Sequence, residues 1–173
     1  MTALPVRLRP GRREDIDAIV ALDRATEFAP HWPVALYEEI VDVARPGAKL
    51  SPRRCLIVAE CGLADESRPP VAGFAVGLGP LAGSTGEEGS CIAELEDVVV
   101  AEDRRRGGIG RALCGGVVEW CKLQGATEVV LEVRAGNAGA IALYGQLGFV
   151  QLGFRPKYYR DPDDDAIAMR LSL

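Results

Sequence analysis

The sequence predicts an α/β domain in which helices cross over between the strands of one central sheet. Two observations support this prediction. The second half of the chain has the order strand, helix, strand, helix, strand, and its longest helix follows an amphipathic period throughout. The chain has 173 residues, a length that suits one domain with a sizeable core, so we expect residues 1–173 to form a single domain.

The elements of the second half follow from local residue patterns. Residues 91–100 alternate carboxylates with strand-forming residues and predict a strand. From Ile109 to Cys121, apolar residues recur at the three- and four-residue steps of an amphipathic helix, which Gly125 ends. The remaining elements are a strand over Glu128–Val133, a short helix over Asn137–Leu147 capped by Asn137, and extended chain from Phe149 onward.

The first half of the chain is less regular. It predicts strands over Val6–Arg9, Cys55–Glu60 and Val71–Leu78, and helices over Gly11–Glu27 and Val34–Val43. Stretches rich in proline, glycine and polar residues predict the loops Arg45–Arg53, Ala64–Pro70 and Gly79–Ser90.

Composition narrows the class of protein. With 20 Lys and Arg against 25 Asp and Glu, the net charge is −5, without the basic excess of a dedicated nucleic-acid binder. No apolar stretch reaches the ~18 residues of a membrane span, and the start lacks the apolar region of a secretory signal. The five cysteines include no CxxC pair and only one histidine is present, so we expect reduced thiols and no zinc site. These observations predict a cytosolic protein without nucleic-acid or membrane partners.

A basic, glycine-rich loop joins the clearest strand to the clearest helix. Glycines let the backbone approach a ligand, the helix N-terminus presents unpaired N–H groups, and arginines donate to phosphate in pairs. The loop lacks the third glycine of a dinucleotide GxGxxG motif and the Gly-Lys-Ser/Thr of a P-loop. It therefore predicts an anion site of another kind, with a solvated turn as the alternative; its sequence is Arg104-Arg105-Arg106-Gly107-Gly108-Ile109-Gly110-Arg111.

Two ordered motifs resemble those of the GNAT N-acetyltransferases. The RxxGxG stretch from Arg105 to Gly110 is similar to the acetyl-CoA pyrophosphate loop of that family. It is followed at the family's spacing by Asn137 and by the ALYGQLGF sequence of residues 142–149. The sequence LEVRA at 131–135, with Tyr158 and Tyr159, further resembles the RimI-type enzymes, which acetylate the N-terminal alanine of a small-subunit ribosomal protein.

This resemblance implies a fold and a cofactor. The fold is a mixed, mostly antiparallel central sheet flanked by helices, with the cofactor loop between a central strand and its following helix. Acetyl-CoA is the implied co-substrate, and no metal is required. Strand residues Val98, Val99 and Val100 would pair with the pantetheine arm and polarise the thioester carbonyl, and Asn137 would bind further along the cofactor. The pyrophosphate would be held by Arg105, Arg106, Gly107, Gly108, Ile109, Gly110 and Arg111.

The resemblance also implies the catalytic pair. Glu132 matches the general base, acting directly or through water, and Tyr144 matches the acid that protonates the coenzyme A thiolate. The alternatives are a salt bridge between Glu132 and Arg134, which share one strand face, and a purely structural aromatic at position 144. Glu94 and Glu96 are rival bases, since some family members place the carboxylate on that strand.

The implied acceptor is the N-terminal α-amine of a protein, in particular an N-terminal alanine of a ribosomal protein. Other acceptors remain open: a lysine, a polyamine or a small-molecule amine, as does a non-catalytic acyl-CoA-binding module. As strand neighbours, Tyr158 and Tyr159 should face opposite ways, so we expect at most one to touch the substrate. The chain departs from the family pattern at Arg106, which replaces a glycine, and in the Gly79–Ser90 insertion. Oligomeric state and acyl-chain preference are not determined by the sequence.

Overall fold

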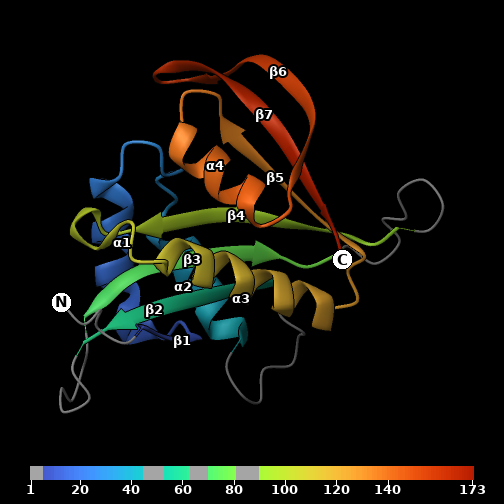
Figure 1. The fold of residues 1–173 in the computed structure, drawn as a ribbon. Helices are drawn as coiled ribbons and strands as arrows, with labels where there is room; N and C mark the ends of the chain where they lie inside the picture. The colour runs from blue at the N-terminus through green and yellow to red at the C-terminus, as the bar shows by residue number, and fades with distance from the viewer. Residues whose placement is uncertain (1–5, 45–52, 63–69, 81–89) are drawn as a thin grey trace.

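The computed structural model of the protein describes residues 6–44, 53–62, 70–80 and 90–173 (Figure 1). Within these ranges, seven strands form one sheet in the order β1-β2-β3-β4-β5-β7-β6. The strands are β1 (Val6–Pro10), β2 (Arg54–Cys61), β3 (Val71–Leu78), β4 (Ile92–Val100), β5 (Glu128–Arg134), β6 (Val150–Arg160) and β7 (Asp163–Ser172). The helices are α1 (Ile16–Ala25), α2 (Val34–Ala44), α3 (Ile109–Leu123) and α4 (Ala138–Gln146), with single 3-10 turns at Arg13–Asp15 and Glu102–Arg104.

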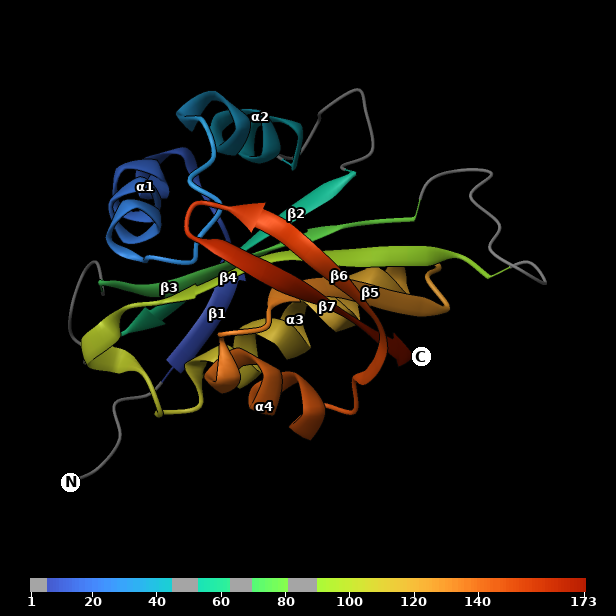
Figure 2. The same ribbon diagram turned by 90° about the horizontal axis from the view of Figure 1, so that it is seen from above.

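Helices cover both faces of the sheet, α1 and α2 on one side and α3 and α4 on the other (Figure 2). The larger apolar cluster lies between the sheet and α3, where Leu113, Val117 and Cys121 are fully buried. A smaller cluster lies under α1 and α2 and is built around Ile19 and Tyr37. The mixed, mostly antiparallel sheet is confirmed, because within the described ranges β4 with β5 is the one parallel pair among six neighbouring pairs.

The parallel pair is short and then separates. β4 and β5 pair only at Ile92–Glu94 with Glu128–Val130, although β4 continues to Val100 and β5 to Arg134. Beyond that point the strands diverge (Figure 1), while β4 stays paired to β3 and β5 to β7 along their lengths. This divergence leaves one edge of β4 open at the centre of the sheet.

A β-bulge changes the face that β4 presents. Val76 of β3 lies opposite Asp97, and the next residue, Gly77, lies opposite Leu95, so Glu96 is the extra residue. Leu95 consequently packs in the cluster under α3, whereas Val99 packs in the cluster under α1 and α2. Without the bulge, residues four apart on a strand would share one face.

The helix predicted over Gly11–Glu27 is shorter in the structure. Asp15 is fully buried, and its carboxylate accepts two hydrogen bonds from the Arg9 guanidinium at 2.7 and 2.9 Å and one from the Arg12 N–H at 2.8 Å. A 3-10 turn therefore precedes α1. The predicted loops Arg45–Arg53, Ala64–Pro70 and Gly79–Ser90 lie largely outside the described residues.

We predict that Gly73→Ala destabilises the sheet because strand β4 passes very close to this glycine. A Cβ atom at Gly73 would lie 2.6 Å from the Val99 carbonyl oxygen, a backbone atom that cannot rotate away. The expected loss in the free energy of unfolding is about 1–3 kcal/mol, measured by urea denaturation. As a matched control, Gly115→Ala in α3 meets nothing within 4 Å and should gain about 0.5–1 kcal/mol. Equal stability of the two variants would contradict this account.

Candidate active site

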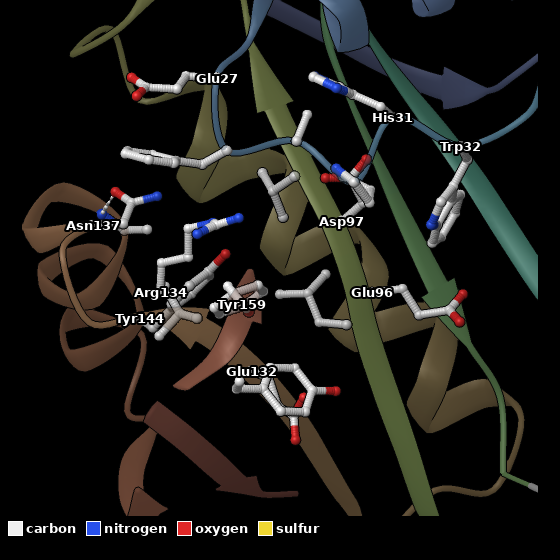
Figure 3. A pocket seen from close by; sticks show the side chains of 18 of the residues that line it. Glu27, His31, Trp32, Glu96, Asp97, Glu132, Arg134, Asn137, Tyr144 and Tyr159 are labelled. Carbon is white, nitrogen blue, oxygen red and sulfur yellow. Dashed lines mark hydrogen bonds between the residues drawn. The ribbon is translucent and has the colours of Figure 1, made fainter. Parts of the chain in front are cut away.

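The divergence of β4 from β5 opens a cleft of about 850 Å³. Its lining residues come from the α1–α2 connection, the middle of β4, the end of β5, both ends of α4, the end of β6 and the β6–β7 turn (Figure 3). Residues distant in sequence thus surround one space, and they include both predicted catalytic side chains, Glu132 and Tyr144.

Glu132 projects into the cleft because its neighbours on β5 project away from it. Val129, Leu131 and Val133 are buried under α3, so Glu132 lies on the opposite face. Its carboxylate forms an ion pair with Arg155 at 2.7 Å.

The Glu132 carboxylate also interacts with the hydroxyl of Tyr158, a hydrogen bond that raises the pKa of that tyrosine. The alternative pairing of Glu132 with Arg134 is wrong. Arg134 instead donates to the carbonyl oxygens of Pro162 and Asp161 at 2.8 and 3.0 Å.

Tyr144 reaches the cleft from α4, with its ring 5.8 Å from that of Phe149. Burial raises the pKa of its hydroxyl above the usual value, and the neighbouring Cys114 and Asp97 add to the effect. The phenol therefore stays protonated near neutral pH and can donate a proton to a developing anion.

The glycine-rich loop lies at the end of β4 and begins α3. Gly108 is the N-cap, with φ +82°, a left-handed conformation that favours glycine, and no side chain caps the helix. Arg106 also has a positive φ, +62°, which explains why the family pattern has glycine there. The unpaired N–H groups of the first α3 turn thus face outward beside exposed arginines.

The loop residues differ in what they offer to a ligand. Arg105 donates through Nε to the Val100 carbonyl at 3.1 Å, and Arg111 donates to Gln146 at 3.0 Å. Ile109 is buried in the core, so only its backbone is available. Gly110 packs against α4, since a Cβ there would lie 3.2 Å from Leu143.

The strand residues Val98, Val99 and Val100 are paired to β3 on one edge only. Val99 is buried in the smaller cluster, and Val98 and Val100 pack against the larger one. Their free edge faces the cleft, where backbone groups remain available. Asn137 lines the cleft at the start of α4, across from β4. Its side-chain oxygen accepts the Ala140 N–H at 3.1 Å, which confirms the predicted helix cap.

The two rival bases on β4 are in different states. Glu96 is held by Arg54 through two hydrogen bonds of 2.7 and 2.8 Å and points away from Glu132 (Figure 3). Glu94 lines the cleft, and burial together with Glu96 and Glu132 raises its pKa. Glu94 can therefore accept a proton from a group in the cleft, whereas both carboxylate oxygens of Glu96 are bonded to Arg54.

Asp97 is the cleft residue that the sequence reasoning did not identify. Its side chain is 8% exposed, and Oδ2 has no hydrogen-bond partner among the described residues. Burial raises the pKa of Asp97 to about 8, and the nearby carboxylate of Asp23 contributes to the increase. A signal was present in the sequence, because Asp97 occupies an inward position between Leu95 and Val99.

Phe28, Arg134 and Tyr159 close one side of the cleft, which we call the roof. The Arg134 guanidinium lies over the Tyr159 ring at 4.1 Å and near the Phe28 ring at 5.6 Å. Tyr158 and Tyr159 both line the cleft, with ring centroids 5.1 Å apart, although neighbours on a regular strand face opposite ways. The cause is a β-bulge before Tyr159, at which Lys157 adopts φ +52°.

Two kinds of feature are absent from the part of the chain that the structure describes. No group of three or more His, Cys, Asp or Glu side chains among them is arranged to hold a metal ion. No helix in the same ranges is both long and apolar enough to cross a bilayer.

Comparisons with known proteins agree with this geometry. Residues 18–149 match the model of the acetyltransferase (GNAT) family. The chain is 42% identical over 83 residues to the [ribosomal protein bS18]-alanine N-acetyltransferase of Escherichia coli K12. That alignment covers 47% of this chain and 56% of the enzyme, so the chain spans about half the length of the curated relatives it matches.

Solved structures show the same fold. The ribosomal-protein-alanine N-acetyltransferase of Escherichia coli superimposes with a TM-score of 0.70 at 24% identity, covering 98% of this chain and 94% of that chain. Arabidopsis thaliana NAA60 in complex with acetyl-CoA gives a TM-score of 0.77 at 18% identity, covering 98% and 99%.

We predict that Asp97→Asn changes how stability depends on pH. The carboxyl group ionises near ~4 in the unfolded chain and at about 8 in the folded protein. Between these values the folded protein holds a proton that the unfolded chain has released, so Asp97 lowers stability as the pH rises. Melting temperatures should show a larger gain for Asp97→Asn at about pH 8.5 than at about pH 5. An equal gain at both would contradict the assigned burial.

Proposed function

Because the chain belongs to the GNAT family of acetyltransferases, we propose that it transfers the acetyl group of acetyl-CoA to the N-terminal α-amine of a protein. The observation that carries this proposal is the cleft between the diverging strands, where Glu132 and Tyr144 lie together beside the open edge of β4. The similarity to the Escherichia coli enzyme supports a ribosomal protein with N-terminal alanine as the acceptor.

The residues at the open edge and the loop fit acetyl-CoA. Apart from the Val100 carbonyl, which accepts from Arg105, the backbone of Val98–Val100 on this edge can pair with the amide groups of the pantetheine arm, and one N–H there can polarise the thioester carbonyl. The uncapped N-terminus of α3, with Arg105, Arg106 and Arg111 around it, suits the pyrophosphate. Asn137, at the far wall, lies where it can contact the cofactor further along.

The two catalytic roles follow from the environments of the side chains. Glu132, which forms an ion pair with Arg155, can take a proton from the amine, directly or through water. Tyr144, kept protonated by burial, can protonate the departing thiolate. An α-amine, with a pKa near ~8, loses its proton more readily than a lysine near ~10.4, which favours the N-terminus as acceptor.

The acceptor would enter beneath the roof formed by Phe28, Arg134 and Tyr159. Among the described residues that line the cleft, six are carboxylates and one, Arg134, is an arginine or lysine. The entrance therefore attracts a positively charged amine.

A peptide panel tests the proposal. The protein is incubated with acetyl-CoA and peptides that carry free N-terminal alanine, blocked N-termini with lysine, or neither, together with polyamines, and the products are read by mass spectrometry. Acetylation of the free N-termini is expected. Acetylation of lysines or polyamines alone would overturn the acceptor assignment, and binding of acetyl-CoA without thiol release would indicate a non-catalytic module.

We predict that Glu132→Gln and Tyr144→Phe each lower kcat by about 100-fold or more, because each removes one proton-transfer group. Neither side chain is required to hold the cofactor, so the Kd for acetyl-CoA, measured by calorimetry, should stay within about threefold of wild type. Full activity of both variants would show that the catalytic assignment is wrong.

We predict that Gly108→Ala weakens acetyl-CoA binding. Its φ of +82° is strained for any residue with a Cβ, at a cost of about 1 kcal/mol, and relaxation would turn the first N–H groups of α3 away from the phosphates. The KM for acetyl-CoA should rise several-fold in steady-state assays. Gly145→Ala in α4, where an added Cβ meets nothing within 4 Å, is the control and should leave that KM unchanged.

A further inference from the structure

The β4 bulge places the Asp97 carboxyl group in the cleft without an ion-pair partner among the described residues. Because Glu96 is the extra residue, Asp97 turns toward α1 and α2 instead of following Leu95 under α3. Its side chain is 92% buried, lines the cleft, and leaves Oδ2 without a hydrogen-bond partner among the described residues. A buried carboxyl oxygen without a hydrogen-bond partner destabilises the fold unless a ligand donates a hydrogen bond to it.

The groups that face Asp97 supply no positive charge from an arginine or a lysine. They are Asp23 from α1, Tyr37 from α2, His31 from the α1–α2 connection, Glu96 from β4 and Tyr144 from α4. Asp23 already has partners, since it pairs with Arg24 and accepts the His31 N–H at 3.1 Å. Arg24 donates its other nitrogen to the Trp32 carbonyl at 2.8 Å. Among the described residues no arginine or lysine is placed to pair with Asp97, so a cationic ligand in the cleft can do so.

The proposed reaction supplies such a cation and needs a second proton acceptor. The acceptor arrives as an ammonium group with three hydrogens on nitrogen and leaves as an amide with one. Two protons are therefore lost: one balances the thiolate that departs when the C–S bond breaks, and the other goes to solvent. Glu132 and Tyr144 account for the loss that accompanies C–N bond formation. The earlier loss, which frees the nitrogen lone pair, has no assigned residue.

We propose that Asp97 is a second catalytic carboxylate, which binds the acceptor's ammonium group and takes its first proton. This inference rests on the proposed function. In the complete sequence, Asp97 receives a proton from R–NH₃⁺, and the neutral amine forms the C–N bond to the thioester carbon. Glu132 then takes the second proton from nitrogen, and Tyr144 gives its proton to the thiolate as the C–S bond breaks. The proton on Glu132 returns to the Tyr144 phenolate through water, and Asp97 releases its proton to solvent.

The environment of Asp97 suits this step better than that of Glu132. The Glu132 carboxylate is already engaged within the protein, by Arg155 at 2.7 Å and by the Tyr158 hydroxyl, whereas Oδ2 of Asp97 has no partner among the described residues. Burial raises the pKa of Asp97 to about 8, close to the ~8 of an N-terminal ammonium and more than two units below lysine. A proton therefore moves between Asp97 and an α-amine at little cost in free energy.

The experiment compares the pH dependence of kcat/KM for the acceptor in wild type, Asp97→Asn and Glu132→Gln, at saturating acetyl-CoA. The measurement uses whichever amine the wild-type protein acetylates in the panel. If the wild-type protein acetylates no α-amine, the proposed function fails. If the wild-type protein does so and Asp97→Asn behaves like it, only the Asp97 proposal fails. The matched control is Glu119→Gln, an exposed carboxylate on α3 outside the cleft.

For Asp97→Asn, we expect a loss of about tenfold at pH 8, where the Asp97 carboxylate and the α-ammonium coexist, that shrinks to less than about threefold at pH 9.5, where an α-amine is already neutral. The KM for acetyl-CoA should stay unchanged. Glu132→Gln should lose activity equally at both pH values, because its proton leaves only during C–N bond formation. Wild-type activity of Asp97→Asn at every pH, or a loss of the same size at both, would overturn the proposal.

Discussion

Backbone N–H and C=O groups in a protein interior require hydrogen-bond partners, and the separation of β4 from β5 removes such a partner from the centre of the sheet. After three residue pairs, β5 follows β7 and leaves the edge of β4 facing a cleft. A ligand with amide groups can occupy that edge as a strand would. This one divergence opens the space that Glu132 enters from β5 and Tyr144 from α4. The loop at the end of β4 lies next to the same space.

Charge is distributed to match two different substrates. The loop that ends β4 presents exposed arginines at a helix N-terminus, whereas most of the charged residues that line the cleft are carboxylates. The net charge of −5 is thus an average over a basic region and an acidic one. A polyanionic cofactor and a cationic amine would approach from regions of opposite potential, which keeps each out of the other's site.

The elements that follow from local periodicity were predictable from the sequence. The α3 helix begins at Ile109 as predicted, and Glu132 faces the cleft because strand side chains alternate. The features that were missed depend on irregular backbone or on long-range pairing. The bulge at Glu96 turns Asp97 to the face under α1 and α2, and a second bulge brings Tyr158 and Tyr159 to one cleft. The ion pair of Glu132 forms with Arg155, 23 positions later in the chain, and not with Arg134, the alternative partner on the same strand. No residue pattern signals where a strand gains an extra residue.

The arrangement of Arg134 separates the choice of substrate from the chemistry. Its side chain connects the Phe28 segment to the Asp161–Pro162 turn, and among the described residues it forms no hydrogen bond or ion pair with Glu132 or Tyr144. A change in Phe28 or in the turn would reshape the entrance while the proton-handling groups stay where β4, β5 and α4 hold them. The same fold can therefore acquire new acceptors through its two roof segments alone, which leaves the sheet free to preserve a single reaction.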